Sequence, residues 1–109
     1  MPRPYIAMDR WKIIIIDKND IEVQKILDVL VEYQHVHPNA QIEARRRNPV
    51  SIRIRIVDLD FKGMSRVDRA PEIWKLLKRL PADVFVNITM LLLLTPKEMG
   101  NSLAYLTMR

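Results

Sequence analysis

The alternation of hydrophobic and polar positions predicts elements in the order β-α-β-β-α-β-α. A β-branched run at 11–16 predicts a strand covered on both faces, because a half-wet strand would expose two of its consecutive isoleucines. Apolar residues then recur at helical spacing over 23–31, and Asn19 followed by Glu22 indicates that a helix begins there. The first third of the chain therefore has the pattern of a strand followed by an amphipathic helix.

Two alternating segments, 41–45 and 50–57, predict a β-hairpin whose turn lies at 46–49. One face of this hairpin is aliphatic. The other face carries the polar and charged side chains Gln41, Glu43, Arg45, Arg53 and Arg55. We expect Glu43 to lie near an arginine across the ladder, as an exposed pair worth under about 1 kcal/mol.

The second half of the chain is predicted to supply two more helices and a strand. Pro71 suits the first position of a helix that Pro81 ends, after a turn or short helix at 65–70. The segment 83–94 predicts a strand, and its later half is apolar on both faces, so we expect it in the centre of the sheet. The start signals of a last helix, a cap, a proline and an acidic residue, stand at Thr95, Pro96 and Glu98.

This order of elements predicts one α+β domain over 1–109, with the helices packed on one face of a sheet. Two architectures share the order. The first is a KH-like αββαβ core with an extra N-terminal strand and a C-terminal helix. The second is the ferredoxin-like βαββαβ fold, a split βαβ arrangement in which the first strand is central.

Composition excludes several classes of function. The chain has a net charge of +5, no cysteine and only two glycines, Gly63 and Gly100. The lack of cysteine excludes disulfides, thiol catalysis and thiolate-bound zinc or iron–sulfur clusters. The two separated glycines exclude glycine-rich phosphate loops and the nucleophile elbow. No catalytic constellation is evident, so we expect neither an enzyme nor a cofactor.

The apolar runs are too short for a membrane protein. The longest, 13–16 and 90–94, fall far below the ~20 residues that span a bilayer. The polar, proline-bearing start at 1–9 does not have the pattern of a targeting segment. We therefore expect a cytoplasmic protein without membrane contact.

Five arginines are concentrated in the hairpin, at Arg45, Arg46, Arg47, Arg53 and Arg55. One hypothesis is a patch that binds phosphate or nucleic acid, because the planar guanidinium matches phosphate oxygens. The simpler interpretation is a solvated edge that keeps the hairpin soluble and blocks edge pairing. Few exposed aromatic residues are expected nearby to stack on bases, which argues against single-strand binding.

Other polar residues are weaker candidates. His35 and His37 form an H-x-H pair, but a metal site needs further donors that the sequence does not show, so we expect two exposed histidines and no metal. Asp58 and Asp60 could hold Mg²⁺ or act as acid and base, although turn formation is the commoner role. Asn87 stands in an apolar strand, where its amide needs a partner or lines a small pocket.

The segment 61–98 carries a spaced set of positions at Phe61, Gly63, Ser65, Arg69, Thr95 and Pro96. In this spacing it resembles the BolA-like proteins, which have an F-x-G-x-S entry, an R-H-R-x-V-Y-x-x-L helix and a final strand ending in T-P-x-E. With the first helix and the hairpin included, the resemblance covers about residues 21–98. It implies a KH-like class II fold and binding to monothiol glutaredoxins, sometimes through a shared [2Fe–2S] cluster. Some members of the family are transcriptional regulators.

The chain departs from this family where the family has its ligands. Ala70 stands in place of the helix histidine, and Asn87 in place of the histidine of the last strand. The hairpin loop that supplies the second ligand has neither His nor Cys at 45–48. Because a neutral amide or a guanidinium cannot replace imidazole or thiolate on iron, the resemblance implies a BolA-like protein without cluster chemistry and with a weakened link to glutaredoxin.

The expected function is thus a small, non-enzymatic adaptor or regulator that acts through protein–protein contacts. The alternative is a KH-like nucleic-acid-binding protein that uses the arginine-rich hairpin. A third hypothesis is a homodimer that pairs through the edge of the first or second strand.

Overall fold

The computed structural model describes residues 13–15 and 20–101, with side chains from 20 to 100. The elements are β1 (Ile13–Ile15), α1 (Ile21–Val36), β2 (Gln41–Asn48), β3 (Ser51–Val57), the 3-10 helix η3 (Leu59–Phe61), α2 (Arg66–Leu77), α3 (Ala82–Phe85), β4 (Ile88–Leu94) and α4 (Pro96–Asn101). The α+β class predicted from the sequence is confirmed. None of the helices in these residues combines the length and the apolar character needed to cross a bilayer. The predicted positions Trp11 and Asn19 lie outside the described residues.

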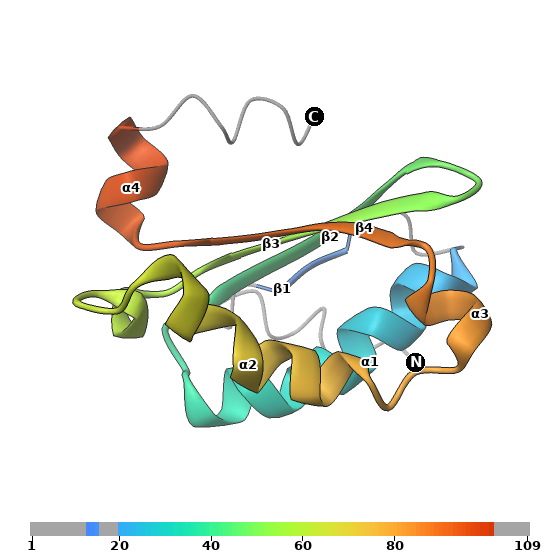
Figure 1. Ribbon diagram of the computed structural model, residues 1–109, viewed down its shortest axis with the longest axis horizontal. Helices are drawn as coiled ribbons and strands as arrows, with labels where there is room; N and C mark the ends of the chain where they lie inside the picture. Colours follow the sequence, from blue (N-terminus) through green and yellow to red (C-terminus); the bar gives the residue numbers. More distant parts are fainter. Residues whose placement is uncertain (1–12, 16–19, 102–109) are drawn as a thin grey trace.

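The strands form one mixed sheet in the order β1-β2-β3-β4. β1 is parallel to β2, β2 is antiparallel to β3, and β3 is parallel to β4. Helices α1 and α2 lie side by side under one face of the sheet (Figure 1). Each helix connects two strands that pair directly, so neither βαβ unit is split and β1 lies at an edge of the sheet. The ferredoxin-like alternative is therefore wrong.

The core lies between this sheet face and the two helices. Its fully buried side chains come from every layer, as with Ile26 and Leu30 of α1, Ile54 of β3, and Ile73 and Leu77 of α2. Burying each such side chain contributes about 1.5 to 3 kcal/mol. The core thus fixes the positions of α1 and α2 on the sheet. The polar clusters described below lie at the two ends of this layered structure.

The hairpin is longer than predicted and its turn is tighter. Both Arg46 and Arg47 belong to β2, and the turn lies at 49–50 rather than at 46–49. Asn48 supports this turn, because its Oδ1 accepts the backbone N–H of Val50 at 2.9 Å. The predicted cross-strand pair is confirmed: Glu43 lies opposite Arg55, and their charged atoms are 2.6 Å apart. Its exposure was predicted wrongly, since Glu43 is buried.

The starts of both long helices differ from the prediction. Asp20 caps α1 by accepting the N–H of Val23 at 3.1 Å. Ser65 caps α2 by accepting the N–H of Asp68 at 3.2 Å. The helix therefore begins before Pro71, which lies inside it; the prediction that Pro71 occupies the first position is wrong. The helix starts earlier because the Ser65 side chain accepts one of the free N–H groups of its first turn.

The segment 83–87 does not belong to a strand. Pro81 leads into α3, where the N–H of Phe85 donates to the Pro81 carbonyl at 2.9 Å. This turn buries Val84 and leaves Val86 exposed, whereas a strand would put both on one face. Strand β4 begins after Asn87 and lies at the end of the described sheet, not in its centre. Its apolar character did not require a partner at both edges, and most of its residues are only partly buried.

Candidate functional site

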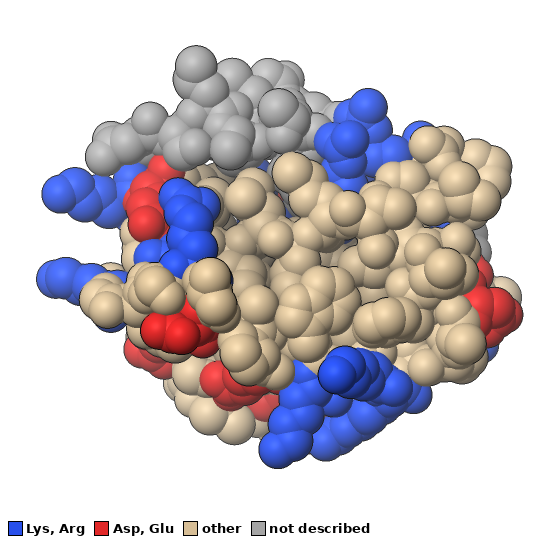
Figure 2. Space-filling model, in the orientation of Figure 1, with Lys and Arg blue, Asp and Glu red and all other residues tan. Residues whose placement is uncertain are grey.

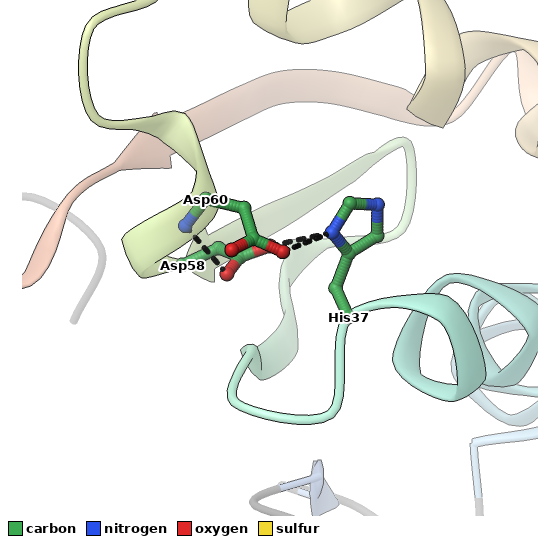
Figure 3. Close-up of side chains that lie close together, drawn as sticks. All are labelled: His37, Asp58 and Asp60. Carbon is green, nitrogen blue, oxygen red and sulfur yellow. Dashed lines mark hydrogen bonds and ion pairs between the residues drawn. The ribbon is translucent and has the colours of Figure 1, made fainter.

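The end of α1 brings a histidine beside two aspartates that are distant in sequence. His37 caps the helix, and its backbone N–H donates to the carbonyl of Tyr33 at 2.8 Å. Asp58 and Asp60 lie where the chain leaves β3 and enters η3. Figure 3 shows the imidazole of His37 directed at both carboxylates. The core packing of α1 against the sheet therefore assembles three polar side chains at one end of the molecule.

Both nitrogens of the His37 ring face carboxylates. Nδ1 lies 2.6 Å from Asp60 Oδ2 and 3.4 Å from Asp58 Oδ2, and Nε2 lies 2.9 Å from Glu72 Oε2 of α2. We call these four residues the histidine–carboxylate cluster. A neutral imidazole has a single N–H, so a ring that donates at both nitrogens is an imidazolium. Burial lowers the pKa of His37, but the bonds to Asp60 and Glu72 outweigh it and raise the pKa above its ordinary value.

Asp58 is fully buried and held by three neighbours. Its Oδ2 accepts the hydroxyl of Tyr33 at 2.5 Å, and its Oδ1 accepts the backbone N–H of Asp60 at 3.0 Å. The Tyr33 ring also stacks on His37, with centroids 4.1 Å apart. Burial, and then the bond to Asp58, raise the pKa of Tyr33, so its hydroxyl remains a donor. The orientation of the buried carboxylate is therefore fixed.

The cluster has the chemistry of a cation site. One ligand atom each of His37, Asp58 and Asp60 lies within 4.8 Å of the other two. An imidazole nitrogen and carboxylate oxygens suit a divalent metal as well as a proton. From the sequence, the H-x-H pair and the D-x-D pair were two separate candidates. The fold brings His37 of the first pair together with both aspartates of the second. The expectation of two exposed histidines is wrong for His37, which is partly buried, and right for His35.

Tyr33 and Glu72 were missed by the sequence reasoning. Tyr33 belongs to the buried stripe of α1 and had no other distinguishing feature. Glu72 is an exposed acidic residue of α2, separated from His37 by 35 positions. A local pattern contains no signal for such a pair, because only the packing of α2 beside α1 brings them together.

The hairpin arginines are divided between the two faces of the sheet. Arg46 reaches the carboxylates at the start of α1. Arg45 and Arg55 face the other way, where they lie 3.4 and 2.6 Å from the carboxylate of Glu43. Alternation along a strand causes this division. On the face shown in Figure 2, lysines and arginines also form separate groups with neutral surface between them.

A second polar network lies at the hairpin end. Arg46, which the sequence suggested as part of a phosphate-binding patch, is bound there to carboxylates of the protein itself. Arg46 donates to Asp20 through Nε at 2.5 Å and Nη2 at 3.1 Å, and to Glu22 through Nη2 at 2.5 Å. Asn87 Nδ2 donates to the same Glu22 oxygen at 3.2 Å. We call Asp20, Glu22, Arg46 and Asn87 the hairpin-end network. The hydrogen bond to Arg46 lowers the pKa of Asp20, and the bond to Asp20 raises the pKa of Arg46.

Three large apolar side chains are exposed at this end. Their exposed fractions are 69% for Ile21, 67% for Val50 and 69% for Val86. Each precedes or follows a residue that is hydrogen-bonded at this end. Ile21 precedes Glu22, Val50 follows Pro49, whose carbonyl accepts from Arg46, and Val86 precedes Asn87. The start of α1, the hairpin turn and α3 also lie together at one end of the molecule in Figure 1. We call these three side chains the apolar fringe of the hairpin end, because exposed apolar side chains that gather on one surface are typical of a contact site.

The other motif positions have structural roles. Phe61 is buried beneath the guanidinium of Arg69, which lies 5.6 Å from the ring centroid. Gly63 has φ +83°, a conformation that side chains with a Cβ rarely adopt. Ser65 caps α2, and Thr95 caps α4, whose first residue is Pro96. The predicted start of the last helix is confirmed, since Glu98 also accepts the backbone N–H of Thr95 at 2.9 Å.

Comparison of the chain with models of known protein families, with curated proteins and with solved structures gives no match.

Proposed function

We propose that this protein is a small, non-enzymatic BolA-like adaptor that acts through protein–protein contacts and holds no iron–sulfur cluster. The observation that carries the proposal is the hairpin-end network. The two segments in which the family has its ligands correspond here to the hairpin and to the residue before β4. These segments lie together, and in the correspondence that the resemblance implies an ion pair and an amide stand where the family has its metal donors.

The chemistry of the network is unfavourable for iron. Arg46 is a cation bound to two carboxylates, and the side-chain amide of Asn87 donates a hydrogen bond to Glu22. A guanidinium repels a metal ion and has no lone pair to offer, and the amide is a poor ligand for iron. The order of elements between α1 and β4, α-β-β-α-β with β3 in the middle of three strands, agrees with the KH-like core that the resemblance implies.

The contact surface proposed for the partner is the apolar fringe of the hairpin end. Ile21, Val50 and Val86 are largely exposed, and each is the sequence neighbour of a residue whose polar group already has a partner. Burying these side chains against a partner contributes favourable free energy without leaving the network's charges unpaired. The family resemblance makes a monothiol glutaredoxin the partner to test first.

The experiment is a calorimetric titration of the chain with a purified monothiol glutaredoxin. We expect saturable binding that Val86→Asp and Val50→Asp weaken at least about tenfold, because placing a charge in an apolar contact costs about 1.4 kcal/mol or more. Val67→Asp is the matched control: Val67 is 81% exposed at the start of α2, away from the hairpin. No binding by the unaltered chain would refute the glutaredoxin partner. A change in the visible spectrum of a cluster-loaded glutaredoxin on adding the chain would refute the absence of ligation.

The pairing of the arginines favours this function over nucleic-acid binding. Arg46 lies within ion-pair distance of two carboxylates, and Arg45 and Arg55 share the carboxylate of Glu43, so most of the charge of these three residues is balanced within the protein. A nucleic-acid-binding protein loses affinity steeply as salt rises, because phosphate contacts release counterions. We expect a labelled oligonucleotide to show no such salt-dependent binding in an anisotropy titration.

A further inference from the structure

We propose that His37, Asp58 and Asp60 form a binding site for a divalent first-row transition-metal ion, Zn²⁺ being the representative case. The site lies at the end of α1, away from the hairpin end, and goes beyond the adaptor function. It would give the protein a bound ion that is independent of any cluster shared with a partner.

The geometry of the three ligand atoms suits such an ion. His37 Nδ1 is 2.6 Å from Asp60 Oδ2 and 3.4 Å from Asp58 Oδ2, and all three atoms fall within 4.8 Å of one another. Bonds of about 2.1 Å place adjacent ligand atoms around Zn²⁺ roughly 3 to 3.5 Å apart. Asp60 must move outward slightly to admit the ion. Its side chain is 57% exposed and has room to do so.

The balance of charge favours a doubly charged cation. Asp58, Asp60 and Glu72 bring three negative charges, and their ion pairs within the described part of the chain all run to His37. Even with the ring protonated, one positive charge faces three carboxylates, and one of these, Asp58, is fully buried. An ion bound at His37 Nδ1 displaces the proton there, which passes to solvent, and the net charge of the cluster changes from −2 to −1.

The surrounding contacts orient the ligands as they do around bound metals. Glu72 accepts a hydrogen bond from Nε2 of His37, which leaves Nδ1 as the ligand atom. The hydroxyl of Tyr33 and the N–H of Asp60 hold the two oxygens of Asp58. A carboxylate behind a ligating histidine and donors behind a ligating carboxylate are the usual second layer of a metal site. Three protein ligands leave further coordination positions for water.

The test is a titration of the tag-free full-length chain with Zn²⁺ by calorimetry, together with thermal unfolding at increasing Zn²⁺. We expect one saturable site, and a rise of the unfolding temperature with Zn²⁺ because the ion binds only the folded state. Asp60→Asn should weaken binding at least about tenfold, the scale of losses seen when a metal site loses a supporting group. Asp60 is exposed, so this variant keeps the buried Asp58 intact.

His35→Asn is the decisive control, because an H-x-H pair by itself attracts Zn²⁺. His35 precedes His37 by two residues and takes no part in the cluster. If His35→Asn leaves the affinity unchanged while Asp60→Asn and His37→Asn reduce it, the proposed site is supported. No saturable binding by the unaltered chain would overturn the proposal. So would binding that His35→Asn abolishes and Asp60→Asn leaves intact, because the ion would then sit on the histidine pair alone.

Discussion

Arg69 of α2 and Glu98 of α4 form a two-fold ion pair across 29 positions of sequence. Nη1 lies 2.6 Å from Oε1 and Nη2 lies 3.1 Å from Oε2. Arg69 is buried, and it also donates to the carbonyls of Met64 and Leu93. The pair thus ties the start of α2 to the end of β4 and the last described helix.

Removing the acidic partner should be costly because it leaves a buried guanidinium without its counter-ion. We expect Glu98→Ala to lower the free energy of unfolding by about 2 to 4 kcal/mol, measured by urea denaturation. The matched control is Glu32→Ala. Glu32 also pairs with an arginine, Arg79, but both side chains are about half exposed, so the loss should stay under about 1 kcal/mol. Equal losses in the two variants would show that the burial of Arg69 does not matter.

The same pair predicts a dependence of stability on pH. The hydrogen bond from Arg69 lowers the pKa of Glu98 to about 2, from an ordinary value of 4.5. A lowered pKa in the folded state contributes stability that is complete above pH 4.5 and is lost as pH falls towards 2. The difference in unfolding free energy between the unaltered chain and Glu98→Gln should therefore be constant from pH 7 to pH 5 and shrink below that. Asp20, whose pKa is lowered by Arg46, is present in both proteins, so its contribution cancels.

Arg46 is predicted to contribute strongly to the stability of the hairpin end, because it bonds to two carboxylates and two turn carbonyls there. Arg46→Ala leaves Asp20 and Glu22 close together without a counter-charge, and it removes the bonds to the turn carbonyls of Asn48 and Pro49. We expect a loss of about 2 to 3 kcal/mol by urea denaturation. Arg46→Lys should restore only part of it, because an ammonium cannot reproduce the planar fork. Lys25→Ala, an exposed change on α1, should stay within about 0.5 kcal/mol.

Tyr33→Phe should destabilise the protein although it keeps the aromatic packing. The change removes the hydroxyl that donates to the buried Asp58 carboxylate. Hydrogen bonds to charged groups contribute about 1.5 to 3 kcal/mol, and we expect a loss in this range. Unchanged stability would mean that His37 and the Asp60 N–H satisfy Asp58 without the hydroxyl.

Local features of the fold were predictable because their causes lie within a few residues. Thr95 and Glu98 cap the last helix three positions apart, and the alternation of β2 and β3 put Glu43 on the same face as the arginines, one of which, Arg55, lies opposite it. The wrong predictions of secondary structure came where a local pattern fits both a strand and a helical turn. Val84 and Val86 alternate like a strand, yet the proline before them starts a helical turn.

The amino-acid sequence by itself determined the class of the fold, the main periodic elements and the cap of the last helix. These depend on spacing and on contacts within a turn. Only the tertiary structure decided which polar groups meet. His37 joins Asp60 and Glu72 across 23 and 35 positions, and Arg46 joins Asp20 across 26. Hydrophobic burial positions the helices on the sheet, and the polar partners at their ends are a consequence of that packing that no local pattern encodes.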